Sequence, residues 1–162
     1  MQLLLIRHAI AEEAGPEIDD ADRALTRRGR RRFEQGVKGL CALGLHVDQL
    51  LFSPRLRAVQ TAELAAPLLR RLGVAQICDL LAQPHGDALR DCFVGERVAL
   101  VGHEPWLSAL CAALVVGPRA DGAAFAMKKG GVALLEGEPR DGQMALIGFY
   151  PPALLRKLGR AT

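Results

Sequence analysis

Short apolar runs and longer amphipathic stretches alternate along the chain. The runs LLLI at 3–6, VDQLLFS at 47–53 and RVALVGH at 97–103 are dominated by Leu, Val and Ile over the length of a strand. Continuous apolar runs of this kind are typical of strands that are buried on both faces of a sheet. The pattern therefore predicts three core strands.

A helical period governs the stretch between Thr26 and Gly44. Thr26 is a suitable N-cap, and Gly44 is a suitable residue at which to end the helix. The apolar side chains between them recur at i, i+4, i+7 and i+8, which predicts one buried stripe: Phe33, Val37, Leu40 and Cys41.

The stretch 56–72 also shows a helical stripe, which reaches Leu69 and Leu72. Gly73 would end this helix. Pro67 lies inside it and predicts a kink or an earlier break, because proline lacks a backbone donor.

Strands that alternate with helices favour an α/β fold. We expect one domain over 1–162, with three α/β/α layers and a mostly parallel central sheet. The remaining elements are assigned from the same patterns: a strand at 74–81, a short helix at 87–93, a helix at 105–116, a hairpin or two edge strands within 123–150, and a closing helix at 151–158.

The composition is that of an ordinary folded domain, with 162 residues, 50% hydrophobic and 24% charged. A net charge of +3 suits an anionic substrate or an acidic partner, but does not by itself indicate nucleic acid. No apolar stretch is long enough to span a bilayer. The four cysteines form no C-x-x-C pair and lie among apolar residues, which favours free thiols and a cytoplasmic location.

The carboxyl ends of the predicted core strands carry the candidate chemistry. The first ends in Arg7 and His8, the second runs into SPRLRAVQTA at 53–62, and the third ends in VGHEP at 101–105. In an open parallel sheet such ends meet at one edge, where ligands bind. Arginines and histidines without matching carboxylates would form a positive pocket there. Guanidinium groups match the oxygens of a phosphate dianion.

These motifs resemble those of the histidine phosphatase superfamily, whose fold is also called phosphoglycerate mutase-like. LIRHA at 5–9, SPRLRAVQTA at 53–62 and VGHEP at 101–105 occur in the family's order and spread over most of the chain. The compact length, RALTRRGRRR at 23–32 and KKGGVALLE at 128–136 are most similar to its small SixA-type phosphohistidine phosphatases. The resemblance implies a phosphatase that needs no metal or other cofactor.

The resemblance also implies the roles of four residues. His8 would be the nucleophile that takes the phosphoryl group, and His103 would complete the pocket. Arg7 and Arg57 would clamp the phosphoryl oxygens. Attack on phosphorus requires a neutral His8, and nearby arginines should lower its pKa. Arg55 does not match a catalytic position of the family and is expected at a helix start.

Two positions depart from the family's pattern. Ala9 replaces the glycine that usually follows the first histidine, and alanine would be strained if this residue required a positive φ. The mutase-like members carry a catalytic glutamate in the middle of the chain, whereas the corresponding segment here has only Asp79 and Asp87. Glu104 is a candidate proton donor, with a helix cap as the more ordinary interpretation.

Other polar residues have both a structural and a functional interpretation. Ser53 is expected as a turn residue whose hydroxyl could touch phosphate, and His85 as a loop residue that could line the pocket mouth. The basic run 27–32 is expected to be a solvated helix face that could help dock an acidic protein, and not a nucleic-acid site. A zinc site of His8, His85 and His103 is disfavoured, because the adjacent arginines repel a cation.

The primary hypothesis is a metal-independent phosphatase that removes phosphate from phosphohistidine in proteins, through a phosphohistidine intermediate on the enzyme. An imidazole leaving group needs a proton less than an alkoxide does, so the absent glutamate favours this substrate. The alternative is the same chemistry on a small phosphate ester, such as a sugar phosphate or a nucleotide. A third hypothesis is a phospho-ligand binding module without turnover, against which the intact His8 argues. We expect no cofactor, no nucleic-acid partner and no membrane association.

Overall fold

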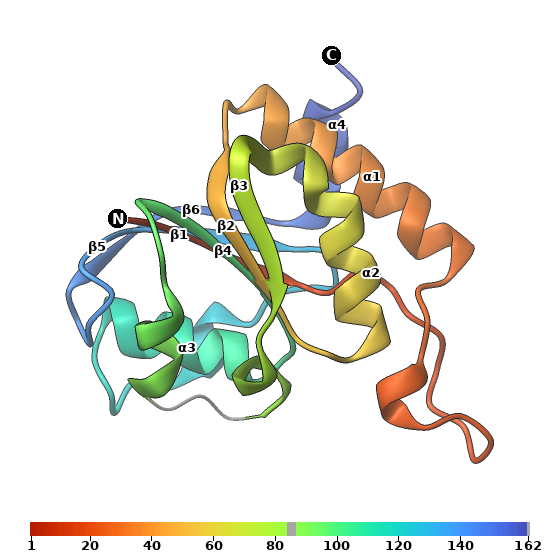
Figure 1. The fold of residues 1–162 in the computed structure, drawn as a ribbon, viewed down its shortest axis with the longest axis horizontal. Helices are drawn as coiled ribbons and strands as arrows, with labels where there is room; N and C mark the ends of the chain where they lie inside the picture. Colours follow the sequence, from red (N-terminus) through yellow and green to blue (C-terminus); the bar gives the residue numbers. More distant parts are fainter. Residues whose placement is uncertain (84–86, 162) are drawn as a thin grey trace.

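A six-stranded mixed sheet lies at the centre of the protein. The computed structural model describes residues 1–83 and 87–161, and Figure 1 shows the sheet between two helical layers. From β3 to β1 the strands are parallel, whereas β5 is antiparallel to β1 and β6 to β5. Across the sheet the order is β3 (Leu69–Ile77), β2 (Val47–Phe52), β4 (Arg97–Gly102), β1 (Gln2–Arg7), β5 (Val132–Gly137) and β6 (Met144–Tyr150).

Helices cover both faces of this sheet. Along β1, Leu4 packs with one helical layer and Leu5 with the other, because successive side chains on a strand point to opposite faces. The predicted three-layer α/β/α class is confirmed. The first layer contains α1 (Arg27–Ala42), α2 (Leu56–Ala65) and α4 (Pro152–Leu158), and the second contains α3 (Trp106–Val115) with several 3₁₀ turns.

The first predicted helix is confirmed as α1. Thr26 Oγ1 accepts a 2.8 Å hydrogen bond from the backbone N–H of Gly29, which is the expected capping contact. The predicted stripe faces the core, where Phe33 and Leu40 are buried. Gly44 follows the helix with φ +72°, a left-handed conformation that favours glycine.

The second predicted helix, over 56–72, is wrong in its last third. α2 ends at Ala65, and a 3₁₀ turn, Ala66–Leu68, follows. Pro67 lies at the start of that turn. Because the α-helix has already ended there, the N–H that proline lacks is not needed for a helical hydrogen bond. The break that proline imposes thus overrides the apolar period.

An edge strand, β3, replaces the last part of that helix. It starts at Leu69, earlier than the strand predicted at 74–81, and ends at Ile77. Leu72 is 91% exposed, so the helical spacing of the leucines does not correspond to a buried face in this segment. β3 is the edge strand of the described sheet: it pairs with β2, and no other described strand lies on its far side.

The last third of the chain builds the antiparallel end of the sheet. β5 and β6 form the predicted hairpin, and β5 also pairs with β1, so that the side chains from Val132 to Leu135 are buried. α4 follows as predicted and packs against α1. The short helix predicted at 87–93 is a 3₁₀ helix, Asp87–Cys92. Within the described ranges, no helix is long and apolar enough to cross a membrane.

Candidate active site

Three parallel strands deliver their carboxyl ends to one edge of the sheet. β1 ends at Arg7, and the backbone N–H of His8 donates to the carbonyl oxygen of Gly102, at the end of β4, over 3.0 Å. After β2, the N–H of Ser53 donates to the carbonyl oxygen of Val101 over 3.1 Å. The three sequence motifs therefore meet in space, as their strand ends predict. We call the cluster that they form the His8 pocket: His8, Arg7, Ser53, Arg57 and His103.

The ring of His8 is held in one tautomer. Only 4% of the residue is exposed, and Nδ1 lies 2.7 Å from the carbonyl oxygen of Ala9. A carbonyl oxygen can only accept a hydrogen bond, so Nδ1 carries the ring proton. The lone pair is therefore on Nε2, which is the atom able to attack phosphorus.

The two histidines of the pocket are both neutral at pH 7. Their ring centroids are 5.1 Å apart and their planes are inclined by 50°. Burial lowers the pKa of His8 to about 3, and the positive charges of Arg57 and Arg7 act in the same direction. Burial likewise lowers the pKa of His103 to about 3, together with His8 and Arg57. The predicted direction for His8 is confirmed, but desolvation is a larger cause than the arginines.

Ser53 is a partner of His103 and not a simple turn residue. It is fully buried, and its Oγ lies 2.9 Å from His103 Nε2. The backbone N–H of Arg55 points at the same oxygen over 3.4 Å, so the Ser53 hydroxyl proton is available for Nε2. In that arrangement His103 Nδ1 carries a proton. This buried nitrogen has no hydrogen-bond partner among the described residues, which suits it to donate to a ligand.

Arg57 is almost fully buried and is tied to a carboxylate. It is 3% exposed, and its Nη2 lies 3.0 Å from Oδ2 of Asp20, while Nη1 donates to the backbone carbonyl of Asp20. Its Nε is buried and has no partner in the described chain. The guanidinium plane is thereby fixed, with the buried Nε–H among the donors that remain free for a ligand.

The sequence-based expectation that the pocket has no matching carboxylate is wrong. Asp20 also pairs with Arg55 over 2.9 Å and with Arg23 over 3.1 Å. Although partial burial opposes it, the hydrogen bond from Arg57 and the charges of these arginines lower the pKa of Asp20. Asp20 lies in a loop full of acidic residues, and no pattern in the sequence distinguishes it from its neighbours. Arg55, at the start of α2, is confirmed as a helix-start residue.

Arg7 is linked to Glu104 through the backbone of a single residue, Met127. Arg7 Nη1 donates to the carbonyl oxygen of Met127, and the N–H of Met127 donates to Glu104 Oε1 over 2.8 Å. Glu104 Oε2 accepts hydrogen bonds from the N–H and the hydroxyl of Ser108, in the first turn of α3. Both carboxylate oxygens are thus engaged, Oε2 by the first turn of α3 and Oε1 by the loop that precedes β5, whereas the N-cap position of α3 itself is held by Pro105. Burial lowers the pKa of Arg7, and Glu104 opposes that shift.

Ala9 is unstrained. No residue other than glycine has a positive φ among the described residues, so the strain considered for Ala9 does not arise. Its backbone N–H donates to Thr61 Oγ1 over 3.0 Å, and this hydroxyl in turn donates to the carbonyl oxygen of Arg57 over 2.6 Å. Thr61, which sequence reasoning did not single out, therefore joins β1 to α2 behind the pocket.

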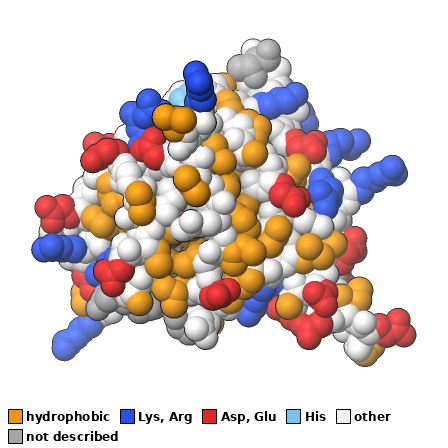
Figure 2. Space-filling view, viewed as in Figure 1, with side chains coloured by type: hydrophobic (Ala, Val, Ile, Leu, Met, Phe, Trp, Pro, Cys, Tyr) orange, Lys and Arg blue, Asp and Glu red, His pale blue; other side chains and the backbone are white. Residues whose placement is uncertain are grey.

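The remaining candidates that the structure describes lie outside the His8 pocket. His85 lies outside the described residues, and Asp79 is exposed in a 3₁₀ turn. His46 is exposed between α1 and β2. Figure 2 shows Lys and Arg side chains projecting into solvent on the side where α1 lies, as expected for a solvated basic run. Across residues 1–83 and 87–161, no three His, Cys, Asp or Glu side chains are grouped so that they could hold a metal ion.

Comparison with known proteins places this geometry in a family. No protein-family model matches the chain. An uncharacterized protein of Picosynechococcus sp. is 34% identical in an alignment 145 residues long. The alignment covers 82% of this chain and 82% of that protein. The chain belongs to the same family as that protein.

Solved structures identify the fold of this family. The protein histidine phosphatase SixA in complex with tungstate aligns over 96% of this chain and 99% of its own, with a TM-score of 0.76 and 24% identity. The present chain therefore has the SixA-type histidine phosphatase fold. An Agrobacterium tumefaciens protein described as a SixA phosphohistidine phosphatase aligns over 93% of this chain and 97% of its own, with a TM-score of 0.75 and 22% identity. A mycobacterial glucosyl-3-phosphoglycerate phosphatase aligns over 93% and 98%, with a TM-score of 0.67 and 17% identity. At these identities the likeness is one of fold, and it confirms the phosphoglycerate mutase-like class predicted from the sequence.

Proposed function

We propose that this protein is a metal-independent phosphatase that removes phosphate from phosphohistidine in proteins, with His8 as the nucleophile. The observation that carries the proposal is the state of the His8 ring. It is neutral, its proton is held on Nδ1 by the carbonyl oxygen of Ala9, its lone pair is on Nε2, and the positive charges of Arg57 and Arg7 are near enough to lower its pKa. A nucleophile that stays unprotonated beside a phosphate-binding pair of arginines is what in-line phosphoryl transfer requires.

In the first step, Nε2 of His8 attacks phosphorus and forms an N–P bond, while the bond from phosphorus to the substrate's ring nitrogen breaks. Charge on the phosphoryl oxygens is stabilised by Arg7 and Arg57, and by a proton on Nδ1 of His103. The buried Nε of Arg57 and Nδ1 of His103 have no partner in the described chain, which supports their use as donors.

The leaving group decides between substrates. A phosphohistidine that is protonated on its other ring nitrogen departs as a neutral imidazole, so it needs no acid on the enzyme. An ester needs a proton on its departing oxygen. Both oxygens of Glu104 accept hydrogen bonds from Ser108 and Met127, and Asp79 is exposed, so neither supplies an evident acid. This supports phosphohistidine over a phosphate ester.

In the second step, water attacks the phosphorus of phospho-His8. The new O–P bond replaces the N–P bond, whose electron pair returns to Nε2. Phosphate leaves as the dihydrogen ion and loses a proton to solvent, and the ring returns to its neutral form. The low pKa of His8 favours this return, because the free ring is not protonated in the folded protein at pH 7.

The alternative is hydrolysis of a small phosphate ester in the same pocket. The fold is shared with a glucosyl-3-phosphoglycerate phosphatase, and a cavity of about 520 Å³ adjoins the pocket. A cavity of this size accommodates a small molecule. In either case we propose a cytoplasmic enzyme, since all four cysteines are free thiols.

The decisive experiment is a substrate panel in EDTA: a phosphohistidine protein, phosphoramidate, sugar phosphates and nucleotides. We expect the highest kcat/KM with the phosphohistidine protein and a radiolabelled phosphoryl group trapped on His8 after rapid acid-free quenching. A higher kcat/KM for an ester would establish the alternative. Binding of phosphate without any turnover would instead leave a phospho-ligand binding module.

A further inference from the structure

The cavity that adjoins the His8 pocket has a lining of its own. It has a volume of about 520 Å³ and lies between α1, α4 and the loop that precedes β5. It meets the His8 pocket at Arg7 and Ala9, which line it, whereas His8, Arg57 and His103 do not. The cavity is therefore adjacent to the candidate phosphate site but separate from it.

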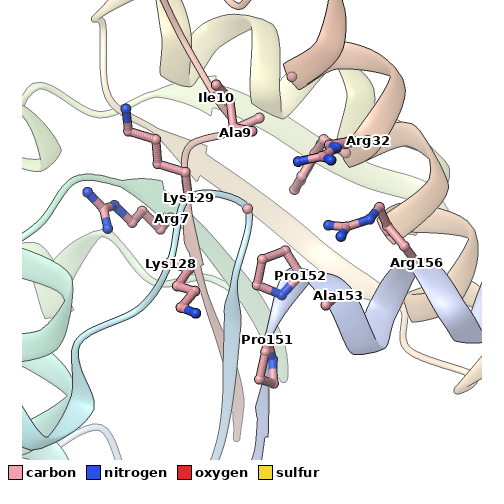
Figure 3. Close-up of a pocket in the computed structure, with 14 residues that line it drawn as sticks. Arg7, Ala9, Ile10, Arg32, Lys128, Lys129, Pro151, Pro152, Ala153 and Arg156 are labelled. Carbon is pink, nitrogen blue, oxygen red and sulfur yellow. The ribbon is translucent and has the colours of Figure 1, made fainter.

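Positive side chains surround this cavity. Besides Arg7, four cations line it and no carboxylate does, and we call these four the cationic groove: Arg32, Lys128, Lys129 and Arg156. Figure 3 shows the guanidinium groups of Arg32 and Arg156 extending from their two helices toward the loop that carries Lys129. No carboxylate among the described residues lies within ion-pair distance of any of these four side chains.

Close helix packing holds the two arginines together. One turn after Arg32, Gly36 packs against the side chain of Leu155, and a Cβ on Gly39 would lie 2.1 Å from the carbonyl oxygen of Leu155. Only glycine permits this approach of α1 to α4. Arg156 directly follows Leu155, so the contact that joins the helices also fixes the two like charges side by side.

The proximity of these cations is electrostatically unfavourable without an anion. Partial burial, together with the charges of Arg28, Arg156 and Arg31, lowers the pKa of Arg32. Lys129 also contributes to the lowered pKa of His8, which shows that the groove and the catalytic ring lie within one electrostatic field. A negative ligand in the groove would relieve this repulsion.

The floor of the groove is apolar. Ile10, Phe33, Pro151 and Pro152 form it between the charged side chains. Inorganic phosphate would leave these surfaces uncovered, whereas a peptide segment brings carboxylates together with methylene groups and backbone. Cations that stand on three separate segments also match several spaced carboxylates better than one compact anion.

We propose that the cationic groove binds an acidic segment of the substrate protein, next to the phosphohistidine that enters the His8 pocket. The proposal rests on the proposed function. It adds that the substrate protein carries negatively charged residues next to its phosphohistidine. It assigns recognition to Arg32 and Arg156 and leaves bond breaking to His8. A substrate with glutamates beside its phosphohistidine will then be preferred over one with glutamines.

The test compares two phosphohistidine peptides that differ only in flanking glutamates or glutamines, with phosphoramidate as a substrate too small to reach the groove. For Arg32→Glu/Arg156→Glu, the preference for the glutamate peptide is expected to fall by about tenfold or more, mostly through KM. Hydrolysis of phosphoramidate is expected to stay within about twofold of the wild type. The matched control is Arg28→Glu/Arg31→Glu, which makes the same charge change on the exposed face of α1.

Three results would overturn the proposal. Equal losses in the groove variant and in the Arg28→Glu/Arg31→Glu control would mean that only net charge matters. An equal loss on phosphoramidate would make the groove part of the His8 pocket. A small bisphosphate ester that depends more strongly than the peptide on Arg32 and Arg156 would identify a small molecule as the occupant.

Binding separates this proposal from the proposed function. Calorimetric titration of His8→Ala with both peptides, unphosphorylated and phosphorylated, measures the groove without turnover. We expect tighter binding of the glutamate peptide in both forms, and loss of that difference in the variant that also carries Arg32→Glu/Arg156→Glu. If the peptides bind in this way but the wild type does not hydrolyse them, the proposed function is wrong and the groove assignment stands. Absence of any glutamate preference overturns the groove assignment alone.

Discussion

The His8 pocket and the cationic groove lie side by side, but they differ in how far their charged side chains are buried and paired. In the pocket, His8 and Arg57 are 4% and 3% exposed, and Arg57 is tied to Asp20. In the groove, Lys128 and Lys129 are exposed and Arg32 and Arg156 are half-buried, with no ion pair to any described carboxylate. The side chains of the pocket are buried and held by hydrogen bonds, whereas those of the groove are partly or fully exposed and form no ion pair with a described carboxylate.

This difference separates two kinds of work. Fixed donors in a low-dielectric pocket stabilise developing charge strongly, because they do not have to reorganise. Exposed cations attract and orient an acidic partner, and their effect is screened by salt. We therefore expect changes in the His8 pocket to act on kcat for every substrate, and changes in the groove to act on KM for acidic proteins.

The largest effect is expected from His8→Ala. Removal of the nucleophile should lower kcat by about 10³-fold or more on phosphohistidine and on phosphoramidate alike. The measurement is phosphate release together with trapping of labelled enzyme. His46→Ala, which removes an exposed histidine far from the pocket, is the matched control and should keep full activity. If His8→Ala retained more than a tenth of the wild-type rate, the mechanism would have to be abandoned.

The next largest effect is expected from Arg57→Ala. Loss of a buried donor to the phosphoryl oxygens should lower kcat by about 10²- to 10³-fold. The control is Arg55→Ala, since Arg55 stands two residues away and contacts the same Asp20, but its side chain is one-third exposed. We expect a loss below about tenfold for this control, because exposed ion pairs contribute little. Similar losses in the two variants would show that Asp20 anchoring, and not phosphate contact, is what Arg57 provides.

The sequence predicted the pocket better than it predicted the partners of the pocket. His8 and His103 were found because each directly follows an apolar strand, and strand ends converge in a parallel sheet. Asp20 was missed because it reaches Arg57 across 37 residues of chain, from a loop in which every second or third residue is acidic. The periodicity of a sequence predicts helices and strands. A contact between a loop and a distant helix produces no such periodicity, so it cannot be predicted in this way.

The same limit explains the error at the end of α2. The leucine spacing up to Leu72 fits a helix, and only the sheet topology shows that this segment lies at an open edge. Pro67 gave the correct signal, but a kink and a complete break look alike in the sequence. Ser53 illustrates a milder case, since its position after β2 was predictable and its contact with His103 Nε2 was not.

Acid is expected to destabilise the protein through the two buried histidines of the His8 pocket. Both histidines have a folded-state pKa of about 3, against 6.5 for an unperturbed ring. Between these values the unfolded chain binds protons that the folded protein does not bind, so stability decreases as the pH falls from 6.5 toward 3. Each ring contributes a slope of up to about 1.4 kcal/mol per pH unit.

Urea unfolding of the wild type and of His103→Gln between pH 7 and pH 4.5 measures this slope. The variant lacks one of the two buried rings, so its free energy of unfolding should fall less steeply with acid. Carboxylates such as Asp20 contribute equally to both proteins and cancel in the comparison. Parallel curves for the two proteins would mean that folding leaves the pKa of His103 unchanged, which contradicts a pKa of about 3 in the folded protein.

A smaller effect is expected from Ser53→Ala. The variant removes the hydroxyl from His103 Nε2, so the ring is no longer held with its proton on Nδ1. The loss of one oriented hydrogen bond should lower kcat by about tenfold and leave KM nearly unchanged. ¹⁵N chemical shifts of His103 report the tautomer directly and would not change if Ser53 only filled space. A wild-type tautomer in Ser53→Ala would therefore assign the residue a packing role.

The smallest effect, and the one that compares the two regions most directly, is expected from salt. Between about 0.1 M and 1 M NaCl the Debye length falls from about 10 Å to about 3 Å, which screens the exposed groove much more than the buried pocket. For the glutamate-flanked peptide, kcat/KM should fall by about three- to tenfold over this range. The glutamine-flanked peptide should respond less, because its only attraction to the enzyme is that of its phosphoryl group for the pocket. Arg32→Glu/Arg156→Glu should show equal salt dependence for the two peptides. If the wild type already treats both peptides alike at every salt concentration, the pocket alone selects the substrate.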